Sequence, residues 1–237
     1  MQPLVSVKGF SEIILKEVVG PVTDEQKPLL ETVIRNADRM GRLIRDLLEE
    51  SRIETGRVKF DLTLVDLREV VERVVKTLTP KIQGKQHAVA LHLATIPPVS
   101  ADRDRLTQVL TTLFDNAIKY TLADGKIDVW AEVQNQSVRL SICDTGIGIA
   151  ADEQWRVFTR FYRGINPVVR EQVGIGFELC IAKGLIELMR GQIGFESEPG
   201  KGSTFWFTLP VAAASDNASI HHGDTKATEK SAFSNTL

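Results

Sequence analysis

In residues 143–149, which read Cys143-Asp144-Thr145-Gly146-Ile147-Gly148-Ile149, one carboxylate and two glycines directly follow an apolar run. The preceding residues, 138–142, alternate between apolar and polar side chains as in a half-buried strand, so Asp144 stands where that strand ends. A carboxylate there can accept a hydrogen bond from an exocyclic amine such as that of adenine. Gly146 and Gly148 lack a Cβ, which permits a positive φ and a close approach of the backbone to a flat ring. An Asp-Gly turn that binds nothing has the same pattern, so two interpretations remain open.

A helix is predicted over residues 104–120, upstream of this strand, because apolar residues recur there at helical spacing. They are Leu106, Val109, Leu110, Leu113, Phe114 and Ala117. Asn116, Lys119 and Tyr120 are spaced i, i+3 and i+4, so an amide oxygen, an ammonium group and an aromatic ring share one helical face. Such groups suit magnesium, phosphate and a base. The alternative is a solvated polar face at the end of a core helix.

Two further segments follow the strand. Residues 157–163 read Val157-Phe158-Thr159-Arg160-Phe161-Tyr162-Arg163, and after a polar stretch Gly174 and Gly176 open an apolar helix that runs to about residue 189. Glycines at the start of a helix can present free amide groups to phosphate. Residues 200–210 predict a turn followed by a strand in which aromatic and polar side chains alternate.

In this order and spacing, the four elements resemble the ATP-binding domain of sensor histidine kinases, a Bergerat-type ATPase in the same group as gyrase and mismatch-repair ATPases. The resemblance covers about residues 60–211. Residues 1–56 extend it, because Lys8-Gly9-Phe10-Ser11-Glu12 and Asn36-Ala37-Asp38-Arg39-Met40 are similar to the two helices of that family's dimerisation region. We therefore expect an α+β chain, in which an N-terminal helical hairpin precedes an α/β sandwich of the histidine-kinase ATPase type. Residues 212–237, rich in small and polar residues, are expected to be a disordered tail.

The second helix of the hairpin carries a heptad seam that can be recognised without the family. Its members are Leu30, Val33, Ala37, Met40, Ile44, Leu47 and Ser51. The first helix supplies apolar residues at 7, 10, 14 and 18, and residues 20–25 predict a turn with a capping residue. A homodimer or heterodimer would bury the remaining apolar flank in a four-helix bundle. The alternative is a monomeric hairpin folded onto the larger domain.

The resemblance implies ATP and Mg²⁺ as ligands and gives each site residue a role. Asp144 would take the adenine amine with support from Thr204, Asn116 would ligate magnesium, Lys119 would face phosphate, and Tyr120 would lie near the base or ribose. The implied nucleotide-binding set is Asn116, Lys119, Tyr120, Asp144, Gly146, Gly148, Arg163, Gly174, Gly176 and Thr204.

The resemblance also implies an ATP lid over about residues 163–176. Arg163, at its start, either reaches a phosphate or is a surface arginine beside a loop. Phe158 and Phe161 either anchor the lid or belong to the core.

The sequence departs from the family pattern at the phospho-acceptor histidine. In the family, His-Glu-Leu-Arg-Thr-Pro-Leu precedes the Lys-Gly-Phe segment, and here Pro3-Leu4 aligns with the end of that motif, so the acceptor position would precede residue 1. The four histidines of the chain, His87, His92, His221 and His222, lie elsewhere. A chain that supplies no acceptor is expected not to phosphorylate itself, although transfer to a partner's histidine stays open.

Two more departures concern the nucleotide pocket. Thr112 stands where the family has an asparagine, four residues before Asn116, and supports magnesium-bound water less well. Glu178 stands where the family has a glycine, after Phe177 in place of a leucine. A carboxylate that points toward a triphosphate weakens its binding by about 1 to 4 kcal/mol, whereas an outward one changes only packing.

Three functions are compared on this basis. The first is the ATP-binding core of a two-component sensor histidine kinase, a phosphotransferase in signal transduction. The alternative is a non-catalytic, dimerising pseudokinase module that binds a response regulator or a partner kinase. A gyrase-type ATPase fits poorly, because its glutamate base would stand near Thr112.

Composition limits the classes of partner and the location. The formal net charge of -2 and the lack of a basic stripe give no reason to expect nucleic-acid binding. No run approaches membrane-spanning length and no signal peptide is recognised, so a cytoplasmic location is expected.

Overall fold

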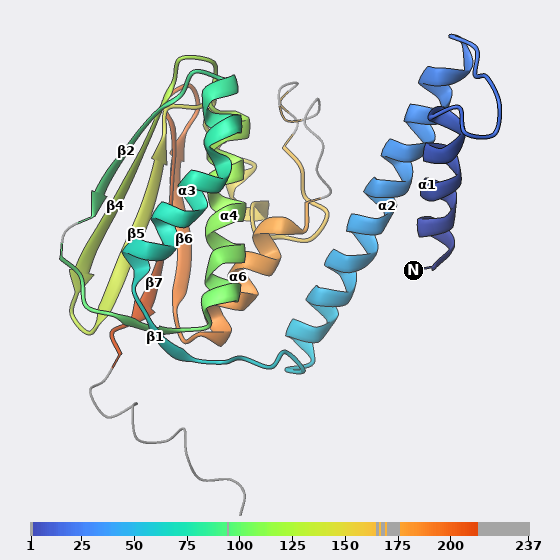
Figure 1. The fold of residues 1–237 in the computed structure, drawn as a ribbon. Helices are drawn as coiled ribbons and strands as arrows, with labels where there is room; N and C mark the ends of the chain where they lie inside the picture. The colour runs from blue at the N-terminus through green and yellow to red at the C-terminus, as the bar shows by residue number, and fades with distance from the viewer. Residues whose placement is uncertain (1, 94, 165, 167–168, 170–175, 213–237) are drawn as a thin grey trace, which may run out of the picture.

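The computed structural model describes residues 2–93, 95–164, 166, 169 and 176–212. Two helices, α1 (Gln2–Leu15) and α2 (Gln26–Glu54), form an N-terminal hairpin. A mixed α/β unit follows, in which helices cover one face of a sheet (Figure 1). The predicted α+β order, a helical hairpin and then an α/β sandwich, is confirmed. The expected disordered tail falls almost entirely outside the described residues.

The main sheet of the described residues has five strands in the order β2-β4-β5-β7-β6. They are β2 (Ala88–Leu93), β4 (Lys126–Gln134), β5 (Ser137–Asp144), β6 (Gln192–Glu198) and β7 (Gly202–Pro210). β2 and β4 are parallel, and the other neighbours are antiparallel. The short strands β1 (Thr63–Val65) and β3 (Val99–Ala101) form a separate antiparallel pair. β5 therefore lies at the centre of the main sheet.

One face of the sheet is buried. Because successive side chains of a strand point to opposite faces, β5 buries every second residue from Val138 to Asp144, and β7 buries Phe205, Phe207 and Leu209. The helices α3 (Leu67–Gly84), α4 (Arg103–Tyr120) and α6 (Glu178–Leu188) cover this face (Figure 1). The helix predicted over residues 104–120 is confirmed, with its apolar stripe buried.

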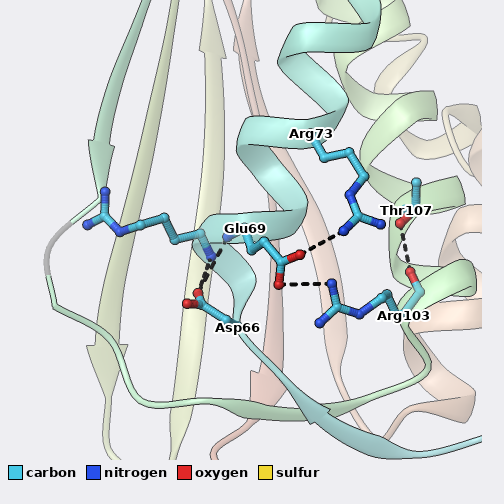
Figure 2. Close-up of polar contacts among 6 residues, drawn as sticks. Asp66, Glu69, Arg73, Arg103 and Thr107 are labelled. Atoms are coloured by element: carbon cyan, nitrogen blue, oxygen red, sulfur yellow. Dashed lines mark hydrogen bonds and ion pairs between the residues drawn. The ribbon is translucent and has the colours of Figure 1, made fainter.

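Polar contacts join the first turns of α3 and α4 (Figure 2). Asp66 caps α3 by accepting hydrogen bonds from the backbone N–H groups of Arg68 and Glu69, at 2.9 and 3.4 Å. Glu69 forms ion pairs with Arg73 on the same helix, at 2.7 Å, and with Arg103 at the start of α4, at 3.0 Å. Because these side chains are solvent-exposed, the pairs align the two helices but contribute little to stability.

The turn between α1 and α2 contains a capping box. Thr23 Oγ1 accepts a hydrogen bond from the Gln26 N–H at 3.3 Å, and Gln26 Oε1 accepts one from the Thr23 N–H at 3.0 Å. The predicted turn with a capping residue is therefore confirmed. α1 ends at Leu15, so the expectation that the first helix reaches Val18 is wrong.

Much of the predicted heptad seam of α2 faces solvent. Met40 and Leu47 are 50% and 52% exposed, and Phe10 on α1 is 67% exposed. Exposed large apolar side chains in a row on one hairpin form a surface that another helix pair can cover.

The C-terminal half of α2 packs against α6. A Cβ placed on Gly184 of α6 would lie 2.6 Å from Cγ2 of Ile53, so glycine is required for this close contact. Ion pairs surround the contact: Arg105 with Glu49, Arg160 with Glu50, and Arg160 with Glu54. An acidic face of the hairpin thus meets two arginines of the α/β unit.

Gly184→Ala is expected to weaken the packing of α2 on α6, because the added methyl group overlaps with Ile53. Overpacking of this kind costs about 1–3 kcal/mol. We expect faster amide hydrogen exchange in residues 43–54, measured by mass spectrometry. Gly84→Ala is the matched control, since nothing lies within 4 Å of a Cβ at Gly84. Equal exchange rates in the two variants would contradict the contact.

Candidate functional site

A cavity lies between the C-terminal end of α4, the end of β5 and the start of α6. Its apolar lining consists of Ile147, Ile149, Val157, Val169, Leu179 and Phe205. Its polar side chains are Asn116, Lys119, Tyr120, Asp144, Glu153, Tyr162, Arg163, Asn166, Glu178 and Ser203. A cavity that combines an apolar surface with convergent polar groups is typical of a small-molecule site. Seven of the predicted site residues line it: Asn116, Lys119, Tyr120, Asp144, Gly148, Arg163 and Gly176.

Asp144 is a buried carboxyl group at the wall of this cavity. It ends β5, is 6% exposed, and its Oδ1 accepts a hydrogen bond from the Gly146 N–H at 2.8 Å. Burial raises the pKa of Asp144 from 3.8 to about 6, although backbone hydrogen bonds from Gly146 and Ser203 oppose the rise. This rise corresponds to about 3 kcal/mol between the two protonation states. A carboxylate that is buried beside a cavity despite this free-energy cost is typical of a ligand-binding group.

The two glycines after Asp144 are required for different reasons. Gly148 has a φ of 66° and lines the cavity, and a Cβ there would lie 2.1 Å from the carbonyl oxygen of Glu198. Gly146 is outside the described lining and has no positive φ, but a Cβ there would lie 2.6 Å from the carbonyl oxygen of Tyr120. The expected positive φ is therefore wrong for Gly146, whereas its approach to a ligand ring stays a prediction. Its role is the close contact between the turn and α4.

Hydrogen bonds hold the C-terminal end of α4 from two sides. The Ile147 N–H donates to the carbonyl oxygen of Tyr120 at 3.2 Å. From the end of α3, Lys85 Nζ donates to the carbonyl oxygens of Ile118 at 2.8 Å, Lys119 at 2.8 Å and Thr121 at 3.1 Å. An ammonium group at this place also complements the negative end of the helix. These bonds fix the backbone of Lys119 and Tyr120, two residues that line the cavity together with Asp144.

The helical face predicted on α4 lines the cavity at Asn116, Lys119 and Tyr120. Burial raises the pKa of the Tyr120 hydroxyl, and the negative charge of Glu178 adds to this effect. Thr112, one turn before Asn116, is half-buried and is not among the described lining residues. The position where the family carries an asparagine therefore adds no side chain to this lining.

Thr204 does not face the cavity. Its hydroxyl donates to the sulfur of Cys143 at 3.2 Å, on the face of the sheet opposite the helices. Ser203 lines the cavity and pairs with Asp144 across β5 and β7. The expectation that Thr204 supports the adenine side is therefore wrong, and Ser203 occupies that position. The alternation of buried Phe205 and Phe207 along β7 was the available signal, because it places Ser203 on the helix-facing side.

The segment that was expected to form a lid is described only in part. Arg163 lines the cavity and donates to the carbonyl oxygen of Val169 at 2.6 Å. Gly176 has a φ of 80°, and a Cβ there would lie 2.3 Å from the carbonyl oxygen of Tyr162. Gly174 lies outside the described residues. Sequence reasoning missed Glu153 and Tyr162, since residues 150–169 show no periodicity that indicates which side chains turn inward. It also missed Leu179, which lines the cavity from the first turn of α6.

Glu178 is the first residue of α6 and lines the cavity with Asn116 and Lys119. Its charge acts on Tyr120, another lining residue, which favours the inward one of the two orientations that the sequence left open. A negative charge therefore belongs to the same lining as the positive charge of Lys119.

Comparison with known proteins assigns the family. Residues 101–213 match the model of histidine kinase-, DNA gyrase B- and HSP90-like ATPases, and residues 2–56 match the His Kinase A (phospho-acceptor) domain. The chain belongs to the histidine kinase family. It combines the two domains of a signal-transduction kinase, in the order expected from the sequence. Within the described part of this histidine kinase, no helix is long and apolar enough to cross a membrane.

Relatives match across both domains. Sensor protein GacS from Pseudomonas syringae pv. syringae is 34% identical over 222 residues, 91% of this chain and 24% of GacS. Signal transduction histidine-protein kinase BarA from Escherichia coli K12 is 34% identical over 214 residues, 87% of this chain and 23% of BarA. The structure of full-length ShkA in complex with AMPPNP aligns with a TM-score of 0.74 and 28% identity, covering 90% of this chain and 44% of ShkA. The chain spans about a quarter of the length of these curated relatives.

Asp144→Asn is expected to change the pH dependence of stability. Between pH 3.8 and about 6 the folded protein holds a proton on Asp144 that the unfolded chain has released, so its unfolding free energy falls as the pH rises through this window. The variant buries no charge. It should therefore be more stable than wild type at about pH 7.5, by at most about 3 kcal/mol, and by less near pH 4.5. Urea unfolding at both pH values measures this, and a constant difference would contradict the assignment.

Proposed function

We propose that the cavity binds ATP with Mg²⁺ and that the chain is the nucleotide-binding core of a two-component sensor histidine kinase. The main observation in support is the buried carboxylate of Asp144, which lies in a largely apolar part of the cavity wall. Its described partners are backbone N–H groups, so the group retains capacity to accept a hydrogen bond from a ligand amine. Adenine offers both an exocyclic amine for Asp144 and a flat apolar ring for Ile149 and Phe205.

The α4 side of the cavity fits the phosphates and the metal ion. Asn116 offers an amide oxygen, a ligand type that Mg²⁺ accepts, and Lys119 and Arg163 offer positive charge. Tyr120 follows Lys119 on α4 and lines the same cavity, so its ring is suited to contact the ribose or the base. One cavity therefore contains an acceptor for the adenine amine and positively charged donors for the phosphates.

Phosphoryl transfer from ATP to a histidine requires mainly positioning and neutralisation of charge. Residues 2–56 contain no histidine, His87 is buried in the α/β unit, and His92 stacks on Trp130 in the sheet. We propose that the accepting histidine is supplied from outside this hairpin, for example by a partner kinase.

Calorimetric titration of ATP with Mg²⁺ into the full chain tests the proposal. We expect binding in the micromolar to submillimolar range and its loss in Asp144→Asn, because the adenine amine loses its charged acceptor. Asp128→Asn is the matched control, since Asp128 pairs with His92 outside the cavity. Equal affinity in wild type and Asp144→Asn would refute the adenine assignment, and no binding to any of the three proteins would refute the nucleotide site.

We also propose that the hairpin forms a homodimer or heterodimer, and that a response regulator docks on the complex. The exposed apolar side chains of α2 support the dimer, because a bundle of two hairpins would cover them. As an ATP-dependent phosphotransferase, the domain would work in the cytoplasm.

Met40→Asp is expected to dissociate the dimer, because it places a charge in the middle of the exposed seam. Light scattering coupled to size-exclusion chromatography should give a dimer for wild type and a monomer for the variant at the same concentration. Arg39→Glu changes the charge of the adjacent residue without entering the seam and should remain dimeric. A wild-type monomer at high micromolar concentration would contradict the proposal.

A non-catalytic, dimerising pseudokinase module is the second candidate function. Two features favour this alternative. Thr112 is not among the described lining residues, and Glu178 adds a negative charge to the lining. Both would weaken the binding of the phosphates. Loss of dimerisation in Met40→Asp together with no nucleotide binding in wild type would select it.

A further inference from the structure

Glu178 lines the same cavity as Asn116 and Lys119, and its charge acts on Tyr120, which follows Lys119 on α4. It is the first residue of α6, an 11-residue helix whose N-terminal amide groups favour a negative charge nearby. Glu178 thus occupies the helix start, where free backbone N–H groups would otherwise favour a bound anion. Among the described ion pairs none involves Glu178.

The charge of Glu178 acts on side chains of two neighbouring helices, α4 and α2. It is the second cause, after burial, of the raised pKa of Tyr120 on α4, and likewise of the raised pKa of Asp46 on α2. Asp46 and Glu178 are like charges near each other at the junction of hairpin and cavity. A ligand phosphate in this cavity meets the negative charge of Glu178 together with the positive charges of Lys119 and Arg163.

We propose that Glu178 determines how many phosphates the cavity accepts: it disfavours a free triphosphate more than a diphosphate, leaves adenosine unaffected, and makes ATP binding depend strongly on Mg²⁺. This inference rests on the proposed nucleotide site. Repulsion grows with the ligand charge near the carboxylate and is absent for the uncharged nucleoside. A divalent cation held at Asn116 would offset that charge, so bound magnesium reduces the penalty.

Glu178→Gln tests the proposal, because it removes the charge and keeps the shape of the side chain. Affinities for adenosine, ADP and ATP are measured by calorimetry, each with EDTA and with Mg²⁺. We expect free ATP to bind at least about 5-fold tighter to the variant, ADP to gain less, and adenosine to stay within about 2-fold. The gain for ATP should shrink when Mg²⁺ is present.

Glu187→Gln is the matched control. Glu187 lies on the same helix, is exposed, and pairs with Lys183 away from the cavity, so its substitution should leave all affinities unchanged. An unchanged adenosine affinity in Glu178→Gln also shows that the cavity is intact.

The possible outcomes separate this inference from the proposed function. Equal changes for all three ligands would mean altered packing and would overturn the role of the charge. Unchanged affinities in Glu178→Gln, with binding still lost in Asp144→Asn, would overturn the inference and leave the nucleotide site standing. No binding of any ligand to wild type would overturn both.

Discussion

The cavity depends on one close backbone contact, in which the turn after β5 presses against the last carbonyl groups of α4. There is no room for a Cβ at Gly146, because it would lie 2.6 Å from the carbonyl oxygen of Tyr120. The hydrogen bond from Ile147 to the same oxygen fixes the distance between strand end and helix end. Asp144 and Lys119 belong to different elements, and this contact keeps both in one lining. A side chain at residue 146 would separate them before it touched any ligand.

Asp144 weakens the fold that positions it. Its raised pKa means that the ionised form is less stable in the folded protein than in water, at the pH where a charged acceptor is useful. The surrounding core compensates, since Ile142, Phe114 and Phe207 are fully buried around the same sheet face. Because the most buried charge of the site opposes folding, a structural role alone does not explain why Asp144 is there.

Periodicity in the sequence predicted the elements well and the cavity in part. The apolar spacing of residues 106–117 and the alternation of residues 138–144 each correspond to one buried face, which is why α4 and β5 were predicted with their orientation. Thr204 was predicted on the wrong face of the sheet because its role was taken from the family resemblance. The alternation of side chains along β7 was not considered. The part of the wall formed by Glu153 and Tyr162 was not predicted, because loop residues turn inward through tertiary contacts that leave no local pattern. The contact of Gly184 with Ile53 joins residues far apart in sequence and has no local signal either.

The helix α6 belongs to two sites at once. Its first residue, Glu178, lines the cavity, and Gly184, about 9 Å further along the axis, packs on Ile53 of α2. A shift of α6 at the cavity therefore moves the surface that contacts the hairpin, because a short helix moves as a rigid body. Arg160 connects the same two regions by another path, since it pairs with Glu50 and Glu54 and lies three residues before the cavity residue Arg163. The region of the cavity is thus joined to the hairpin by two separate sets of contacts, one through α6 and one through Arg160.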